Sequence, residues 1–330
     1  MCQDASLDNE IENDERMSIA IIADGHGSAQ YFRSDIGSKK ATQVAKKGIQ
    51  EFITQNSESN IFKDGNGEKL LVGLAKNIIA TWFGEVEEDE KKNPLVEEEK
   101  VKLLEDKYKK KYLNDPDRQY FYHAYGTTLI AVAITDNYWF GLQIGDGKCV
   151  VLFEDGRWEQ PIPWDDKCFL NSTTSICDDD AISEFRFWYG PVEKEESKPI
   201  GVFICSDGVD DTYPVHENEK HLERLYRSIA LSFVKIGYES TLSQIKELIE
   251  KFAEEGSRDD VSIAGIIKSD LGQYESYLCV EELADRAEEK AEEERKKAEQ
   301  KKQVEQATQV KIDQLQVQNK PDVYIIERRK

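Results

Sequence analysis

The chain has 330 residues, of which 39% are hydrophobic, and a formal net charge of −22. That length allows one large domain or two ordinary ones. The acidic excess argues against a protein that binds nucleic acid or an anionic membrane surface, because both partners require a basic face. No apolar run approaches the ~20 residues of a membrane-spanning helix, and the first residues lack the basic and apolar stretches of a signal peptide.

Six cysteines are present, and none are in CxxC spacing: Cys2, Cys149, Cys168, Cys177, Cys205 and Cys279. Cys149 and Cys205 lie in or beside apolar runs, where free cysteine behaves as a small hydrophobe. The spacing therefore favours neither a disulfide framework nor a structural zinc site. A reduced, cytoplasmic protein is expected.

Hydrophobic periodicity predicts two helices in the first half of the chain, over residues 30–55 and 70–83, and two in the second half, over residues 219–234 and 242–255. Short apolar runs bounded by glycine and polar residues predict strands over residues 17–24, 127–134, 138–144, 148–153, 183–188, 201–205 and 261–267. The three strands between residues 127 and 153 are expected to form a meander. Residues 85–111 are dense in both charges and predict an exposed helical insertion.

The composition changes near residue 277, and residues 281–302 are almost entirely Glu, Lys, Ala, Arg and Gln. Alternating charges with a thin apolar seam predict a long charged helix. Such a helix would be either a solvated tail or one strand of a coiled coil with a helical partner. We therefore expect a domain over residues 1–270, with an insertion at about 84–120, followed by a charged helical tail over residues 277–330.

Four aspartate-rich segments each adjoin a predicted strand: residues 24–27, 145–147, 206–211 and 258–260. Taken singly, each Asp-Gly could be a turn. If the strand ends converge, however, two carboxylates ~4 Å apart repel by roughly 4 kcal/mol at an effective dielectric constant near 20. Arg258 is the one basic residue expected beside them, so a cation must supply the missing charge. Oxygen ligands suit Mg²⁺ or Mn²⁺, which favours a metal-dependent hydrolase.

The order of these motifs resembles that of the metal-dependent serine/threonine protein phosphatases of type 2C. The matching segments are Gln3-Asp4-Ala5, Asp24-Gly25-His26-Gly27, Gly126-Thr127-Thr128, Gly145-Asp146-Gly147, Ser206-Asp207-Gly208 and Asp259-Asp260. The resemblance covers residues 2 to about 268 and leaves the charged tail outside. Nucleophilic cysteine chemistry is not expected, because no cysteine lies in a glycine-rich, anion-binding loop.

The resemblance implies an α+β fold, a four-layer α/β/β/α sandwich of two antiparallel sheets flanked by helices. It also implies a site for two Mg²⁺ or Mn²⁺ ions that hydrolyses phosphoserine or phosphothreonine in a phosphoprotein substrate. Carried over residue by residue, it makes Asp24 the bridging ligand, Gly25 a carbonyl ligand, Asp207 and Asp259 ligands of the other ion, and Asp4 a residue that acts through a coordinated water. Asp146 and Asp211, with Asp207, match a weaker third site, and His26 matches the general acid.

Two features leave alternatives open. The family has a strand before the Gln-Asp motif, often with an arginine that grips the substrate phosphate, whereas here that motif follows Met1 almost at once. We therefore expect the natural reading frame to continue upstream by ~15–25 residues, and the phosphate-gripping residue is not assigned. The alternative function is a catalytically weak or dead scaffold that binds a signalling partner. His26 could be structural, and His123, His216 and His221 lie outside any motif.

Overall fold

The computed structural model of the chain describes residues 2–8, 17–57, 61–62, 65–99, 120–168, 172–192, 198–279 and 295–297. The chain divides into two compact units, Met1–Leu278 and Cys279–Lys330. In the second unit, residues 295–297 are helical. The rest of the charged helix expected over residues 277–330 lies outside the described residues from residue 280 onward, as do residues 100–119 of the expected insertion.

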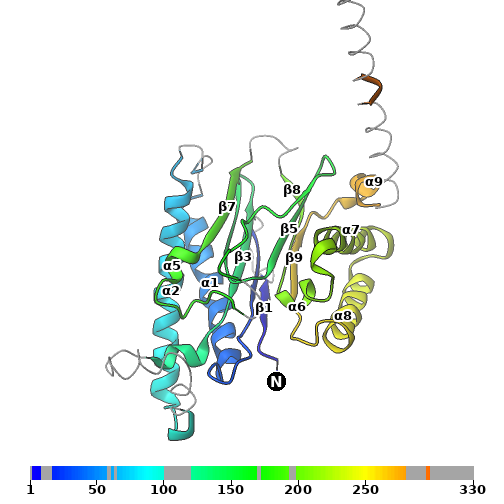
Figure 1. Cartoon of the computed structure of the whole chain (residues 1–330). Coiled ribbons are helices and arrows are strands. Elements are labelled where there is room, and N and C mark those ends of the chain that lie inside the picture. Colours follow the sequence, from blue (N-terminus) through cyan, green and yellow to red (C-terminus); the bar gives the residue numbers. More distant parts are fainter. Residues whose placement is uncertain are drawn as a thin grey trace, which may run out of the picture. The chain divides into compact units, whose positions relative to one another are not determined.

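Two antiparallel sheets form the centre of the first unit (Figure 1). The first sheet has the strand order β1 (Ala5–Asp8), β2 (Met17–Ala23), β3 (Leu129–Thr135), β4 (Tyr138–Ile144) and β7 (Arg186–Pro191). The second has the order β6 (Trp158–Glu159), β5 (Lys148–Phe153), β8 (Pro199–Cys205) and β9 (Ile263–Ile267).

Helices cover the outer face of each sheet (Figure 1). The pair α1 (Ser34–Gln55) and α2 (Gly67–Lys92) packs on the first sheet, and the pair α7 (Asn218–Ile236) and α8 (Tyr238–Glu255) packs on the second. Shorter helices are η1 (Tyr120–Tyr125), α5 (Ala181–Glu184), α6 (Asp207–Asp210), η3 (Val215–Glu217), η4 (Leu271–Tyr274) and α9 (Glu275–Leu278). The predicted α+β sandwich is confirmed.

Strand periodicity explains why the layers hold together. Ile19 and Ile21 of β2 point to one face and pack with the α1 and α2 core, whereas Ala20 and Ile22 point to the other face and pack against the second sheet. Side chains alternate between faces because the strand repeat is two residues. A sheet buried on both faces therefore has a continuous apolar strand, as β2 has from residue 19 to residue 23.

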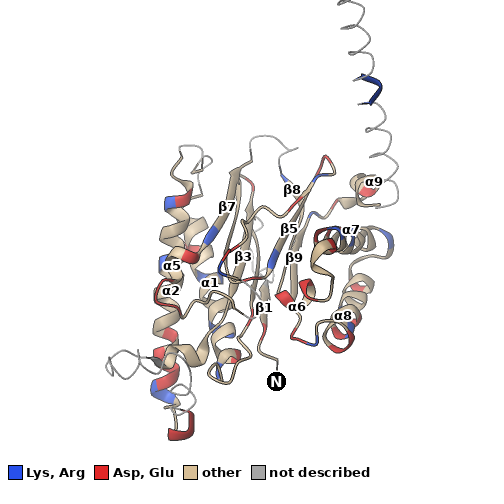
Figure 2. Cartoon of the chain, viewed as in Figure 1, with Lys and Arg blue, Asp and Glu red and all other residues tan. Residues whose placement is uncertain are grey.

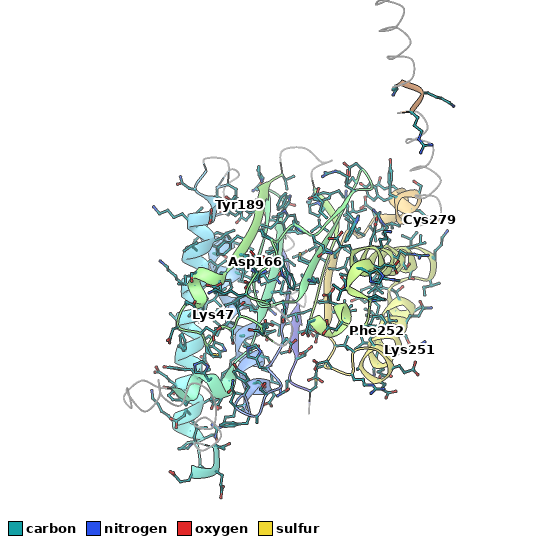
Figure 3. All side chains as sticks on the ribbon, in the orientation of Figure 1. Lys47, Asp166, Tyr189, Lys251, Phe252 and Cys279 are labelled. Atoms are coloured by element: carbon teal, nitrogen blue, oxygen red, sulfur yellow. The ribbon has the colours of Figure 1, made fainter. Side chains whose placement is uncertain are left out.

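The helices are buried along one face only, in contrast to the strands that are buried on both faces. On α8, the buried Phe252 lies next to the exposed Lys251, and both are labelled in Figure 3. On α7, Leu222 and Tyr226, four residues apart, are both fully buried against the second sheet. Residues spaced by four fall on one helix face, so the predicted helices bury one stripe and leave the other in solvent. No described helix is long and apolar enough to cross a membrane.

The predicted meander over residues 127–153 is wrong in its third strand. β3 and β4 pair as expected, but β5 pairs with β6 and β8 in the other sheet. Gly145 has φ 104°, a backbone conformation that favours glycine, and the segment from Gly145 to Gly147 leads from one sheet to the other instead of closing a hairpin. The same segment carries Asp146, so the crossing point is also part of the acidic edge described below.

The observed limits of two other elements, α2 and β7, differ from the predicted limits because of how these segments pack. α2 continues nine residues beyond Phe83 to Lys92, and Val86 is fully buried, so the first part of the segment expected to be exposed over residues 85–111 belongs to a core helix. Trp82 Nε1 donates to the carbonyl of Gly37 at 3.0 Å and fixes α2 on α1. The strand expected at residues 183–188 is β7, which begins only at Arg186 because the short helix α5 precedes it.

Candidate metal centre

The strand registers bring the aspartate segments to one edge of the sandwich. Ala5 pairs with Ala23, so Asp4 and Asp24 adjoin at the end of β1 and β2. Cys205 pairs with both Lys148 and Ile263, so Asp207 lies beside the loops that precede β5 and β9. An isolated bridge between Gly25 and Thr127 continues the pairing of β2 with β3 beyond the ends of these strands. Figure 2 shows the acidic residues of α6 here.

Buried carboxylate oxygens without a hydrogen-bond partner mark the centre of this edge. Asp4 is 9% exposed, and neither of its carboxylate oxygens accepts a hydrogen bond of good geometry, although the Ser206 and Ser262 side chains lower its pKa. One carboxylate oxygen of Asp207 and one of Asp210 also lack a hydrogen-bond partner. Buried polar atoms are normally paired, since leaving a charged group unpaired is costly. These orphaned oxygens, all from carboxylates, fit a site built for hard cations.

Raised pKa values indicate that these buried carboxylates lie close to one another. Burial, together with the charges of Asp4 and Asp207, raises the pKa of Asp24 well above its ordinary value. Burial and the charge of Asp146 raise the pKa of Asp207 to about 7. Burial is also the main reason that the pKa of Asp4 is raised. The raised pKa values mean that the fold disfavours the charged form of each of these carboxyls, a cost that a bound cation would offset.

The outer aspartates belong to the same cluster. Burial raises the pKa of Asp146, and the charge of Asp211 adds to the rise. Burial and Asp210 raise the pKa of Asp211, and Asp259 acts on both Asp211 and Asp207. The exposed Asp259 precedes β9 and follows Arg258, which has a φ of 65°. All the aspartates singled out from the sequence therefore share one electrostatic neighbourhood.

Backbone contacts fix the loop that carries Asp24 and Gly25. The Thr128 amide donates to the Asp24 carbonyl at 2.8 Å, and the Thr127 hydroxyl donates to the same carbonyl at 2.7 Å. The Asp24 amide in turn donates to the Thr128 hydroxyl at 3.1 Å. A Cβ at residue 25 would lie 2.7 Å from the Gln3 carbonyl oxygen, so only glycine allows this close approach. The hydrogen bonds from the Gly-Thr-Thr motif therefore fix the conformation of the Asp-Gly turn.

His26 is half-buried and follows directly after the Asp24-Gly25 turn. Its ring packs edge-on against Tyr31, with ring centroids 4.6 Å apart. Burial lowers the pKa of His26 to about 4, and the neighbouring His123 contributes to the lowering. The imidazole is therefore neutral near pH 7 in the metal-free chain. Proton donation by His26 requires an anion nearby that raises this pKa.

The expectation that Arg258 is the one basic residue near the acids is wrong. Lys148 Nζ lies 3.4 Å from Asp210 Oδ2, and its charge lowers the pKa values of Asp146 and Asp211 against the effect of burial. The same ammonium group lies 3.5 Å from the ring centroid of Trp164, a cation–π contact. Lys148 directly follows the Gly145–Gly147 motif, and this position could have indicated a basic residue near the acids. The direction of its side chain, however, depends on the crossing of β5 into the second sheet.

Two further residues at this edge were missed as well. The Gln3 side-chain amide donates to the His26 carbonyl at 3.2 Å and to the Ser34 hydroxyl at 2.7 Å. Its backbone amide donates to Asp260 Oδ2 at 2.6 Å. Gln3 thus joins the His26 turn to the segment before β9, and Asp260 supports the N-terminal segment. Both residues stood inside recognised motifs, but no local pattern revealed a bond across 257 positions of chain.

Comparison with known proteins gives a family and a set of distant structures. The family model for protein phosphatase 2C matches residues 1–247. A bacterial serine phosphatase is 14% identical, with 80% of this chain and 91% of that chain covered and a TM-score of 0.45. Stp1, a serine/threonine phosphatase from Staphylococcus aureus, is 14% identical, with 80% and 87% covered and a TM-score of 0.44.

The catalytic domain of the serine/threonine protein phosphatase PstP, solved in complex with two manganese ions, is 15% identical to this chain. The match covers 79% of this chain and 95% of PstP, with a TM-score of 0.39. No curated protein shows significant similarity to the chain. Since the family model alone spans well over half of the sequence, the chain belongs to the protein phosphatase 2C family.

Proposed function

We propose that the protein hydrolyses phosphoserine and phosphothreonine monoesters on proteins with the help of two Mg²⁺ or Mn²⁺ ions. The observation that carries the proposal is the convergence of Asp4, Asp24 and Asp207 at one edge of the sandwich, with orphaned oxygens on Asp4 and Asp207. Three crowded carboxylates destabilise a metal-free fold, so their presence favours a cation-binding role over a structural one.

The donor set fits two ions. Asp4 and Asp207 both act on the Asp24 carboxylate, which suits a bridging ligand. At Gly25 the place of a Cβ is filled by the Gln3 backbone, and the family pattern assigns the Gly25 carbonyl as a ligand. We assign the remaining roles by the family pattern: Asp207 and Asp259 as ligands of the second ion, Asp4 through a water, and Asp146 and Asp211 with Asp207 at a weaker third position. Bound Mg²⁺ or Mn²⁺ would supply Lewis-acid chemistry, with charge neutralisation of the phosphate and activation of a water nucleophile.

The chain's own residues would then orient the substrate and move one proton. The departing serine or threonine oxygen must be protonated, and His26 lies on the turn next to Asp24. A phosphate dianion close to the imidazole would raise its pKa from about 4 and favour the imidazolium. Gln3 and Ser34 hold the His26 carbonyl, and so they fix the turn from which the ring projects.

Phosphate release from a phosphoserine peptide tests the proposal. The chelated protein should be inactive, and added Mn²⁺ or Mg²⁺ should restore turnover. Asp259→Asn should remove nearly all activity, whereas Asp136→Asn, an exposed carboxylate in the turn between β3 and β4, should not. Full activity after exhaustive chelation would exclude the two-metal reaction. A protein that binds Mn²⁺ but never releases phosphate would support the scaffold alternative instead.

A further inference from the structure

Three side chains with different ligand atoms meet outside the aspartate cluster. His123 comes from η1, and Cys177 and Asp178 come from the loop that precedes α5. One imidazole nitrogen, the Cys177 sulfur and one Asp178 carboxylate oxygen all lie within 4.8 Å of one another. Cys177 is 4% exposed, and the other two side chains are half-buried. In this group of three side chains, the thiol is therefore buried, and the imidazole and the carboxylate are partly accessible to solvent.

The separation of the sulfur and nitrogen ligand atoms agrees with tetrahedral zinc coordination, and the carboxylate oxygen lies within 4.8 Å of both. The Cys177 Sγ atom lies 3.5 Å from His123 Nδ1. Zinc bonds of ~2.3 Å to sulfur and ~2.05 Å to nitrogen, at a tetrahedral angle, place the two ligand atoms about 3.5 Å apart. The same separation also allows a thiol–imidazole hydrogen bond, which is the ordinary alternative for a buried cysteine. The Cys177 thiol also donates to the Ser175 hydroxyl at 3.2 Å. The Asp178 carboxylate brings a third ligand atom to the same place.

The loop that presents Cys177 and Asp178 is fixed before any metal binds. The Ile176 amide and the Ser175 hydroxyl both donate to the Thr127 carbonyl, at 3.0 and 3.1 Å. The Ser175 amide donates to Asp178 Oδ2 at 2.9 Å and orients that carboxylate. A site whose ligands are already held in place loses little conformational entropy on binding. Because the Thr127 hydroxyl also donates to the Asp24 carbonyl, the loop is tied to the neighbouring acidic edge.

We propose that His123, Cys177 and Asp178 form a binding site for one zinc-class transition metal ion. A mixed nitrogen, sulfur and oxygen set is suited to Zn²⁺, and its thiolate distinguishes it from the all-oxygen cluster that suits Mg²⁺ or Mn²⁺. Binding transfers the Cys177 thiol proton to solvent, and the fourth coordination position is left for water. The site does not depend on phosphatase activity, and a protein without that activity would still bind the ion.

Cobalt spectroscopy of the full chain tests the site directly. Cys2 is exposed and Cys279 is half-exposed, so the titration is made in the Cys2→Ser/Cys279→Ser background to remove accessible thiols. Excess Mg²⁺ is added to compete for the proposed oxygen sites. We expect one Co²⁺ per chain with a thiolate-to-cobalt charge-transfer band, and we expect Zn²⁺ to displace it. Absence of the band in this background would overturn the proposal.

Matched variants assign the ligands. Cys177→Ser should abolish the band, whereas Cys168→Ser should retain it, because Cys168 is also buried but contacts the Thr173 and Thr174 hydroxyls. His123→Asn and Asp178→Asn should each weaken Co²⁺ binding by at least about tenfold. If Cys177→Ser does not fold, His123→Asn decides, since the His123 side chain is only half-buried. A band unchanged in any of these three ligand variants would remove that residue from the site and contradict the proposal.

Discussion

Replacing Asp207 with asparagine should stabilise the metal-free protein while it impairs the metal-loaded one. The Asp207 carboxyl titrates near 3.8 in an unfolded chain, and burial with the charge of Asp146 raises its pKa to about 7 in the fold. Since one pKa unit corresponds to 1.36 kcal/mol, ionising this group costs the fold about 4 kcal/mol. The folded state holds the proton more tightly, so the cost is absent below about pH 4, grows as the pH rises, and is complete above about pH 7.

Thermal unfolding in excess EDTA measures this cost. At pH 8 we expect Asp207→Asn to raise the free energy of unfolding by about 2–4 kcal/mol, which corresponds to roughly 5–15 °C in Tm for a domain of this size. At pH 4 the variant and the parent should unfold at nearly the same temperature. The exposed control Asp136→Asn should change stability by less than about 0.5 kcal/mol at either pH.

Adding Mn²⁺ should reverse the order of stabilities. A cation that binds the folded form and not the unfolded one would stabilise the parent, whereas the variant would lack one of the proposed carboxylate ligands. If Asp207→Asn unfolds at a lower temperature than the parent in EDTA at pH 8, the carboxylates are not in repulsive contact, and the reasoning from burial to metal binding is refuted.

Three further outcomes follow from the structure. His26→Ala should slow hydrolysis of alkyl phosphates by ~10²–10⁴-fold and of aryl phosphates much less, because an aryl leaving group needs less protonation; equal losses on both substrates would exclude the general-acid role. Deleting residues 284–330 should leave Tm and small-substrate turnover nearly unchanged, and an insoluble or inactive product would show that the tail packs on the domain. Arg258→Gly should raise the free energy of unfolding by up to about 1 kcal/mol and so raise Tm, and Arg258→Val should lower Tm, because a φ of 65° strains residues that have a Cβ; the opposite order would mean that the arginine side chain stabilises the fold.

Local sequence predicted most of the described strands, though not β1 or β6, and the residues at their ends. β4 and β5 have the predicted limits, and each aspartate motif lies next to a strand because a turn at the edge of a sheet tolerates polar residues that the interior does not. The order of the motifs then indicated the family. The gathering of Asp4, Asp24 and Asp207 followed from that resemblance and from the hypothesis that the strand ends converge, and the registers agree with it.

What the sequence did not predict depends on contacts between distant segments. The short strands β1 and β6 are stabilised by their partners, β2 and β5, more than by their own residues. β5 follows β4 as a hairpin partner would, but Gly145 has a positive φ and β5 pairs with β8 in the other sheet. Cys177 and His123 are separated by 54 residues, so cysteine spacing alone gave no sign of their contact.

Calorimetric titration of the EDTA-treated chain with Mn²⁺ at pH 7 tests the central claim most directly. The account predicts two tightly bound Mn²⁺ ions per chain, proton release on binding, and loss of tight binding in Asp24→Asn, which removes the carboxylate whose pKa both Asp4 and Asp207 raise. The control Asp136→Asn should bind as the parent does. Absence of tight Mn²⁺ binding in the parent, or undiminished binding in Asp24→Asn, would contradict the account.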